Sequence, residues 1–172
     1  VLQTDKQIDY FKARLDQRLD FGRFSWVNNV QYQKVIQEEI ADQLLSGPLA
    51  LNVPEWLIRS TLMLTSSIFN KALFFQSGAT FTFFTDYYAD QYNPLLAEFV
   101  TQNNTKIGEY PRVDFFFNAK IQSSRIYLKL ENVSAPIEHL IKVDTPYDYY
   151  AAPFSPYRDF SIRFGLIWNF FQ

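Results

Sequence analysis

The feature that most restricts the fold of this chain is a strict alternation of charged and apolar residues near both of its ends. Between residues 8 and 21, five charged side chains occupy every second position, and apolar side chains fill most of the positions between them. A helix would spread these charges around its circumference, whereas a strand points all of them to one face. Residues 160 to 170 repeat the pattern with six apolar side chains on one parity. Both ends therefore predict long strands with two different faces.

The same period of two recurs in five further segments, so the sequence predicts about seven strands. These segments are residues 23–35, 54–69, 73–83, 113–121 and 125–131. A strand of about 12 to 14 residues, rising about 3.3 Å per residue and tilted by about 40°, covers roughly 30 Å, which is the thickness of the bilayer hydrocarbon layer. Strands of soluble proteins average only about 5 to 6 residues. Strand length therefore favours an antiparallel transmembrane β-barrel.

The connections between the predicted strands alternate between short and long. Tight turns are expected near Gly22, Asn70 and Ser123, and long loops near residues 36–53, 88–109 and 134–157. Outer-membrane barrels have short periplasmic turns and long extracellular loops, and single-chain bacterial barrels have an even number of strands. Seven strands therefore predict that residues 1–172 are the C-terminal portion of one larger barrel domain.

The composition agrees with this all-β interpretation. The chain contains 18 Phe, 11 Tyr and 3 Trp, although its mean hydropathy is −0.17 and no apolar stretch approaches the length of a membrane-spanning helix. Such a chain has to separate aromatic from polar residues by alternation. A net charge of −2 argues against a nucleic-acid partner. The absence of cysteine excludes disulfide scaffolds and thiolate zinc sites, and the first residues show no signal peptide.

Tyrosines and other aromatics gather where predicted strands meet long loops. One group follows residue 84 and the other precedes residue 160. The members are Tyr87, Tyr88 and Tyr92, and Tyr147, Tyr149, Tyr150, Phe154 and Tyr157. Amphipathic rings at this level form the interfacial girdles of membrane barrels. Packing of tyrosines inside an ordered loop remains an equal alternative for the second group.

The last strand resembles the terminal signal that barrel-assembly machinery reads. Its polar, glycine and hydrophobic positions are filled by Arg163, Gly165, Trp168 and Phe170. Such signals usually end on the aromatic residue, whereas here Gln172 follows. A glycine that simply relieves crowding in a curved strand is compatible with the same pattern.

From about residue 52 onward, over about 70% of its length, the chain resembles the putative porin family of Bacteroidota outer membranes. The segments that carry the resemblance are Asn52-Val53-Pro54-Glu55-Trp56, Tyr92-Asn93-Pro94-Leu95-Leu96-Ala97-Glu98-Phe99, Ile107-Gly108-Glu109-Tyr110-Pro111, Val113-Asp114-Phe115-Phe116-Phe117-Asn118-Ala119-Lys120 and Tyr157-Arg158-Asp159-Phe160. The resemblance implies a barrel in the bacterial outer membrane, with further strands upstream. It implies the fold more strongly than any activity.

No constellation of residues predicts an enzyme, a cofactor or a metal site. The only histidine, His139, has Glu138 beside it but no evident catalytic partner. The acidic residues Glu38, Glu39, Asp86, Asp90 and Asp144 lack the spacing of a calcium loop and are interpreted as solvated charge. Five scattered glycines do not form a phosphate-binding loop. We therefore expect no catalytic, cofactor or metal residues.

The charged parity of the strands predicts a pore lining. Eight basic and four acidic side chains share it, which gives an excess of positive charge. They are Lys12, Arg14, Arg18, Arg59, Lys120, Arg125, Lys129 and Arg163, with Asp16, Asp20, Asp114 and Glu131. Charged rings bias which ions pass a pore. The alternative is that opposite charges neutralise each other across a plugged interior.

Three classes of function are consistent with these features. A porin for passive diffusion of small solutes or ions accounts for the charged parity and for the lack of catalytic residues. An accessory barrel of a larger envelope complex would have the same strands and use the loops as contact surfaces. A soluble ligand-binding barrel would place its charges outside, so it fits least. The expected partners are outer-membrane lipid, the assembly machinery, and either identical copies or other subunits of an envelope complex.

Overall fold

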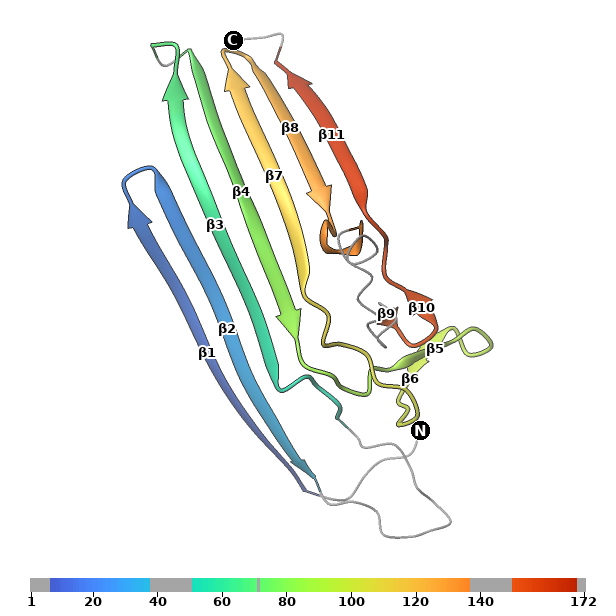
Figure 1. Cartoon of the computed structure of the whole chain (residues 1–172). Helices are drawn as coiled ribbons and strands as arrows, with labels where there is room; N and C mark the ends of the chain where they lie inside the picture. Colours follow the sequence, from blue (N-terminus) through green and yellow to red (C-terminus); the bar gives the residue numbers. More distant parts are fainter. Residues whose placement is uncertain (1–6, 38–50, 71, 137–149, 170–172) are drawn as a thin grey trace.

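The fold was obtained as a computed structural model that describes residues 7–37, 51–70, 72–136 and 150–169. Its main feature is one sheet of seven antiparallel strands in the order β1-β2-β3-β4-β7-β8-β11 (Figure 1). The strands are β1 (Ile8–Phe21), β2 (Phe24–Gln37), β3 (Trp56–Ile68), β4 (Leu73–Phe84), β7 (Arg112–Ile121), β8 (Ser124–Glu131) and β11 (Ser161–Trp168). The predicted all-β, antiparallel fold is confirmed. No helix in the described part is long and apolar enough to cross a membrane.

All three predicted tight turns lie at one end of the sheet, and the strand ends that lead into the long connections lie at the other (Figure 1). Gly22 adopts a φ of 62° in the first turn, where a residue without Cβ carries no steric penalty. Phe69, Asn70 and Gln122 also have positive φ in the other two turns. The hairpins therefore form locally, close to where the sequence places them.

Two of the long connections contain short hairpins that the sequence does not predict. They pair β5 (Gln91–Asn93) with β6 (Glu98–Val100), and β9 (Tyr150–Ala152) with β10 (Ser155–Pro156). In the first hairpin the Asn93 side chain accepts hydrogen bonds from the backbone N–H groups of Leu95 and Leu96. The rings of Tyr92 and Phe99 pack 5.4 Å apart. These loops are thus partly ordered by their own residues.

The long strands shorten along the chain, from 14 residues in β1 to 8 in β11. The last strand is shorter than residues 160–170 suggest, because β11 begins after Phe160 and ends at Trp168, before the described Asn169. Phe170 lies outside the described residues. Strands β1 and β11 form the two edges and do not pair with each other in the described part of the chain. The structure is consequently an open sheet, and the predicted closed barrel is not formed by these strands alone.

The pairing register gives the sheet one apolar and one polar face. The row Leu15, Val30, Ile58 and Phe83 crosses four strands on one face. No second layer covers this face among the described residues, so large apolar side chains such as Leu15 and Phe164 are 60% and 69% exposed. Buried apolar residues are few in the described part of the chain, and two of them, Ala89 and Ile107, lie at the loop end of the sheet. The uncovered apolar face therefore requires an apolar environment or a partner.

Candidate pore-lining site

The polar face of the sheet carries all twelve charged side chains that the sequence predicts to line a pore. The registers place Lys12, Arg14, Asp16, Arg18, Asp20, Arg59, Asp114, Lys120, Arg125, Lys129, Glu131 and Arg163 on the face opposite the Leu15 row. Arg112 joins them, since it pairs in register with Thr82, which in turn pairs with Arg59. Arg112 was not among the predicted pore-lining residues, although its parity with Asp114 was the signal that could have identified it.

The charges on β1 form ion pairs along the strand. Arg14 lies 2.8 Å from Asp16, and Arg18 lies 3.1 Å from Asp20. The side chains of Asn29 and Ser25 on β2 donate hydrogen bonds to the same two carboxylates. All four charged side chains are more than half exposed. Such exposed pairs contribute little to stability, typically about 0–1 kcal/mol, so we interpret this ladder as a solvated charged surface.

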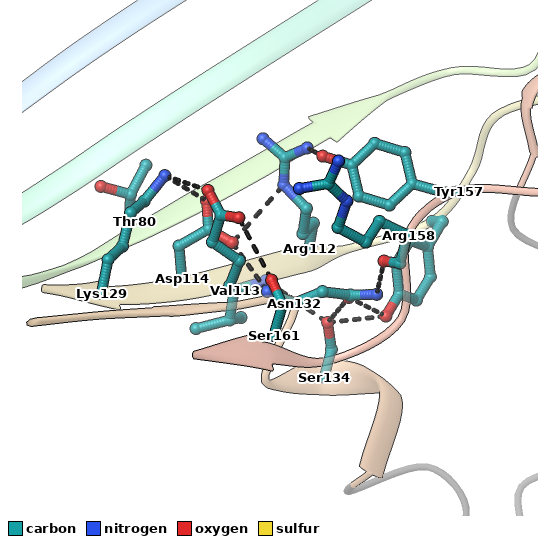
Figure 2. Close-up of polar contacts among 12 residues, drawn as sticks. Thr80, Arg112, Val113, Asp114, Lys129, Asn132, Ser134, Tyr157, Arg158 and Ser161 are labelled. Atoms are coloured by element: carbon teal, nitrogen blue, oxygen red, sulfur yellow. Dashed lines mark hydrogen bonds and ion pairs between the residues drawn. The ribbon is translucent and has the colours of Figure 1, made fainter. Parts of the chain in front are cut away.

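A denser network joins β7, β8 and β11 at the loop end of the polar face (Figure 2). The Glu131 carboxylate binds Lys129 at 2.7 Å and Arg163 at 2.8 Å. Asp114, which is 7% exposed, lies 3.7 Å from the Arg112 Nε and 4.0 Å from the Lys129 Nζ. Lys129 therefore bridges the two carboxylates, and the network contains three cations and two anions.

Asn132 connects this network to the loops (Figure 2). Its backbone N–H donates to Asp114 at 2.9 Å, its side-chain amide donates to the Arg158 carbonyl at 3.1 Å, and the Tyr110 hydroxyl donates to its side-chain oxygen at 2.6 Å. It is 1% exposed and has a φ of 55°, a conformation that asparagine adopts more readily than most residues. Asn132 was not predicted as a site residue.

The segment after β10 lies against the polar face through Tyr157. The Arg112 guanidinium lies 5.1 Å from the Tyr157 ring centroid and also donates a hydrogen bond to its hydroxyl. Beside this contact is a hollow of about 580 Å³, whose charged lining residues are Glu131, Arg158, Asp159 and Arg163. The loop end of the polar face is thus a charged surface with a hollow, and Tyr157 of the following segment packs against it.

The four acidic residues of the polar face all have cationic partners, whereas several basic residues have none. Asp16, Asp20, Asp114 and Glu131 each lie within ion-pair distance of an Arg or Lys. Lys12, Arg59, Lys120 and Arg125 form no ion pair with any described residue. Mutual neutralisation therefore accounts for the acids and leaves an excess of unpaired positive charge on this face.

Two glycines on the polar side of the sheet lie beside aromatic rings of the neighbouring strands. Gly165 pairs in register with Tyr127, and a Cβ at Gly165 would lie 2.2 Å from the Tyr127 ring. Gly78 pairs with Phe116 in the same way, and a Cβ there would lie 2.8 Å from that ring. Glycine in a strand often marks such a close approach. Packing is therefore a sufficient reason for Gly165, whether or not it also belongs to an assembly signal.

We expect Gly165→Val to impair folding because the new side chain collides with the Tyr127 ring. Overpacking typically costs about 1–3 kcal/mol, which urea unfolding of the protein refolded into lipid vesicles would measure. Adding Tyr127→Ser removes the ring and should recover most of this loss. If Gly165→Val still prevents assembly in cells after the ring is removed, recognition of the glycine as a signal, and not packing, explains it.

The remaining predicted positions are distributed over the chain. Arg163 and Trp168 lie on β11, on its polar and apolar faces respectively. The structure does not describe Phe170, His139, Glu138, Glu38, Glu39 and Asp144.

Asp86 forms an ion pair with Lys106 at 2.8 Å in the loop after β4. The hydrogen bond from Lys106 to Asp86 raises the pKa of the lysine. In the described part of the chain, no group of side chains could hold a metal ion.

The fold and the two faces of the sheet define an all-β protein whose long antiparallel strands separate charged from apolar residues. The chain belongs to the Putative porin family, whose family model matches residues 1–172. The match includes the first 51 residues, beyond the part in which the sequence motifs carried the resemblance. Membership in this family implies an outer-membrane location. No curated protein and no solved structure matches the chain.

Proposed function

We propose that this chain is the C-terminal portion of a porin-like transmembrane β-barrel that allows passive diffusion of small solutes or ions across the bacterial outer membrane. The observation that carries the proposal is the segregation of the sheet. The twelve charged residues predicted on the strands, together with Arg112, share one face, and the opposite face is covered with exposed apolar side chains. Lipid-facing and lumen-facing residues alternate in this way in membrane barrels. No catalytic role is assigned to any residue.

Aromatic side chains near both ends of the apolar face support a membrane position. At the loop end the rings of Phe11 and Tyr32 lie 6.3 Å apart, and those of Tyr32 and Trp56 lie 4.8 Å apart. At the turn end Phe21 and Phe24 pair in register and are 63% and 49% exposed. Two aromatic bands of this kind flank the apolar band of outer-membrane barrels. The turns would then face the periplasm and the loops the cell exterior.

The open edges of the sheet support a barrel with more strands than the seven described. The outer edges of β1 and β11 have no partner strand in the described part of the chain. Unpaired backbone groups are too costly in hydrocarbon, so membrane sheets close into barrels. Single-chain bacterial barrels have an even number of strands. Additional strands upstream would provide both the closure and the even number.

Conductance of the full-length protein in a planar bilayer tests this function. Because four basic side chains of the polar face lack carboxylate partners among the described residues, we expect a pore with a weak preference for anions. Reversing two of them, Arg59→Glu with Lys120→Glu, should lower the anion-to-cation permeability ratio below one in a salt gradient. The control is Arg23→Glu, which makes the same type of change in an exposed turn. A selectivity that ignores the double reversal would show that ions do not pass this face.

An accessory barrel in an envelope complex is the second candidate, and the β5–β6 hairpin favours it. Its turn is ordered by Asn93, yet it presents Leu95 and Leu96 with 94% and 59% of their surface exposed. Exposed apolar side chains on an ordered projection suit contact with another protein. A barrel that does not conduct and that co-purifies with a fixed partner, lost on Leu95→Ser with Leu96→Ser, would favour this candidate over a porin.

A further inference from the structure

One row of polar side chains crosses the apolar face of the sheet. Gln17 on β1 pairs in register with Asn28 on β2, and Asn28 pairs with Ser60 on β3. The row ends at β4, where Ser60 pairs with Phe81. These residues have the parity of Leu15 and Leu19, so they belong to the apolar face and not to the proposed pore lining.

The rows on either side are apolar across the same strands. One consists of Leu15, Val30 and Ile58, and the other consists of Leu19, Trp26 and Leu62. The polar row is therefore not the end of the apolar band, where a headgroup zone would explain it. It interrupts the band between two apolar rows and only on β1, β2 and β3.

The hydrogen bonds of this row are only partly satisfied within the sheet. The Trp26 indole N–H donates to the Ser60 hydroxyl at 2.8 Å, and this hydroxyl donates to the Asn28 side-chain oxygen at 2.7 Å. Among the described residues, no hydrogen bond is made by the Asn28 side-chain NH₂ or by the Gln17 amide. Each amide has two donor hydrogens and an acceptor oxygen. The row consequently has donors and an acceptor without hydrogen-bond partners among the described residues.

Free amides are unfavourable on a surface that faces lipid tails. A polar group without a hydrogen-bond partner is strongly destabilising in hydrocarbon, because no water is present to replace the missing partner. The inference rests on the proposed function, because only the membrane barrel turns this face toward lipid. A protein surface that offers both donors and acceptors would satisfy the row. Because the row has no net charge, a charged partner offers no particular advantage.

We propose that the polar row is the contact between two copies of this protein in the membrane. An amide is self-complementary because it both donates and accepts. A two-fold axis would bring Gln17 of one copy opposite Asn28 of the partner subunit, and the reverse contact would form at the same time, as in other isologous interfaces. The apolar rows beside the amides would pack against each other around these hydrogen bonds.

Cross-linking of the full-length protein in outer membranes tests this interface. The present chain has no cysteine, so Leu15→Cys, in the apolar row beside Gln17, provides a single reactive group here and keeps both amides of the polar row, in a full-length background free of other cysteines. A short bismaleimide should convert it to a species of twice the monomer mass. The matched control is Leu128→Cys, on the same apolar face but on β8, which should remain monomeric under the same treatment.

A second variant tests the amides directly. Gln17→Leu together with Asn28→Leu should leave assembly intact, since both changes suit a lipid-facing position, and should reduce the dimer at least tenfold in mild detergent. Three results would overturn the interface. The wild-type protein could require detergent for extraction and yet be monomeric, the dimer could persist in the double variant, or the cross-linked partner could be a chain of different mass. Extraction of the wild-type protein without detergent would overturn the membrane barrel and the interface with it.

Discussion

Leu128→Arg is expected to disrupt assembly of the barrel in the membrane. Leu128 lies on the apolar face of β8, between Phe117 of β7 and Phe164 of β11 in the same row. An arginine on the lipid face at the middle of the bilayer costs about 2–4 kcal/mol. Because natural domains are stable by only about 5–15 kcal/mol, this loss should be visible as unassembled protein. Folding into lipid vesicles, followed by the shift of the folded band on unheated gels, measures it.

The matched control is Asn118→Arg, which adds the same side chain to the other face. Asn118 is exposed on the polar face of β7 and pairs in register with Tyr127 of β8. If this face lines a water-filled lumen, the arginine remains hydrated and assembly proceeds. Equal tolerance of both substitutions would mean that these strands do not cross a bilayer.

Asp114→Ala is expected to cause the largest loss of stability among alanine substitutions of the charged side chains on the polar face. The Asp114 carboxylate accepts a hydrogen bond from the buried Asn132 N–H and is the ion-pair partner of Arg112. A buried donor left without its acceptor costs about 1–3 kcal/mol, and the Arg112 Nε, which is itself buried without a hydrogen bond, would also lose its nearby charge. Urea unfolding in vesicles should show a lower midpoint.

Asp16→Ala is the control for this change because it removes the same group from an exposed pair. Asp16 and its partner Arg14 are 51% and 57% exposed, so the expected cost is below about 1 kcal/mol. If the two alanine variants unfold at the same urea concentration, the network around Asp114 does not stabilise the junction between β8 and the loops.

The strands, their faces and their turns could be predicted from the sequence because their causes are local. The alternation in residues 8–21 determines which side chains share a face, whatever strand lies beside them. Gly22 and Asn70 mark turns because they tolerate positive φ. The number and direction of the long strands follow from these signals, and the match of the whole chain to one family agrees with them.

The contacts between strands were decided by the tertiary structure, because register joins residues that are distant in the sequence. Only the pairing of β7, β8 and β11 brings Asp114, Glu131 and Arg163 into one network, and only the folded loops bring Asn132 and Tyr157 to it.

The same holds for the ring over Gly165 and for the amide row that begins at Gln17. In each case the residue alone looks like any other strand residue in the sequence. Its contact with the partner residue on the next strand is what makes it important for packing or binding. Alternation within a strand determines the face on which a side chain lies, whereas hydrogen-bonded register determines its neighbours on that face.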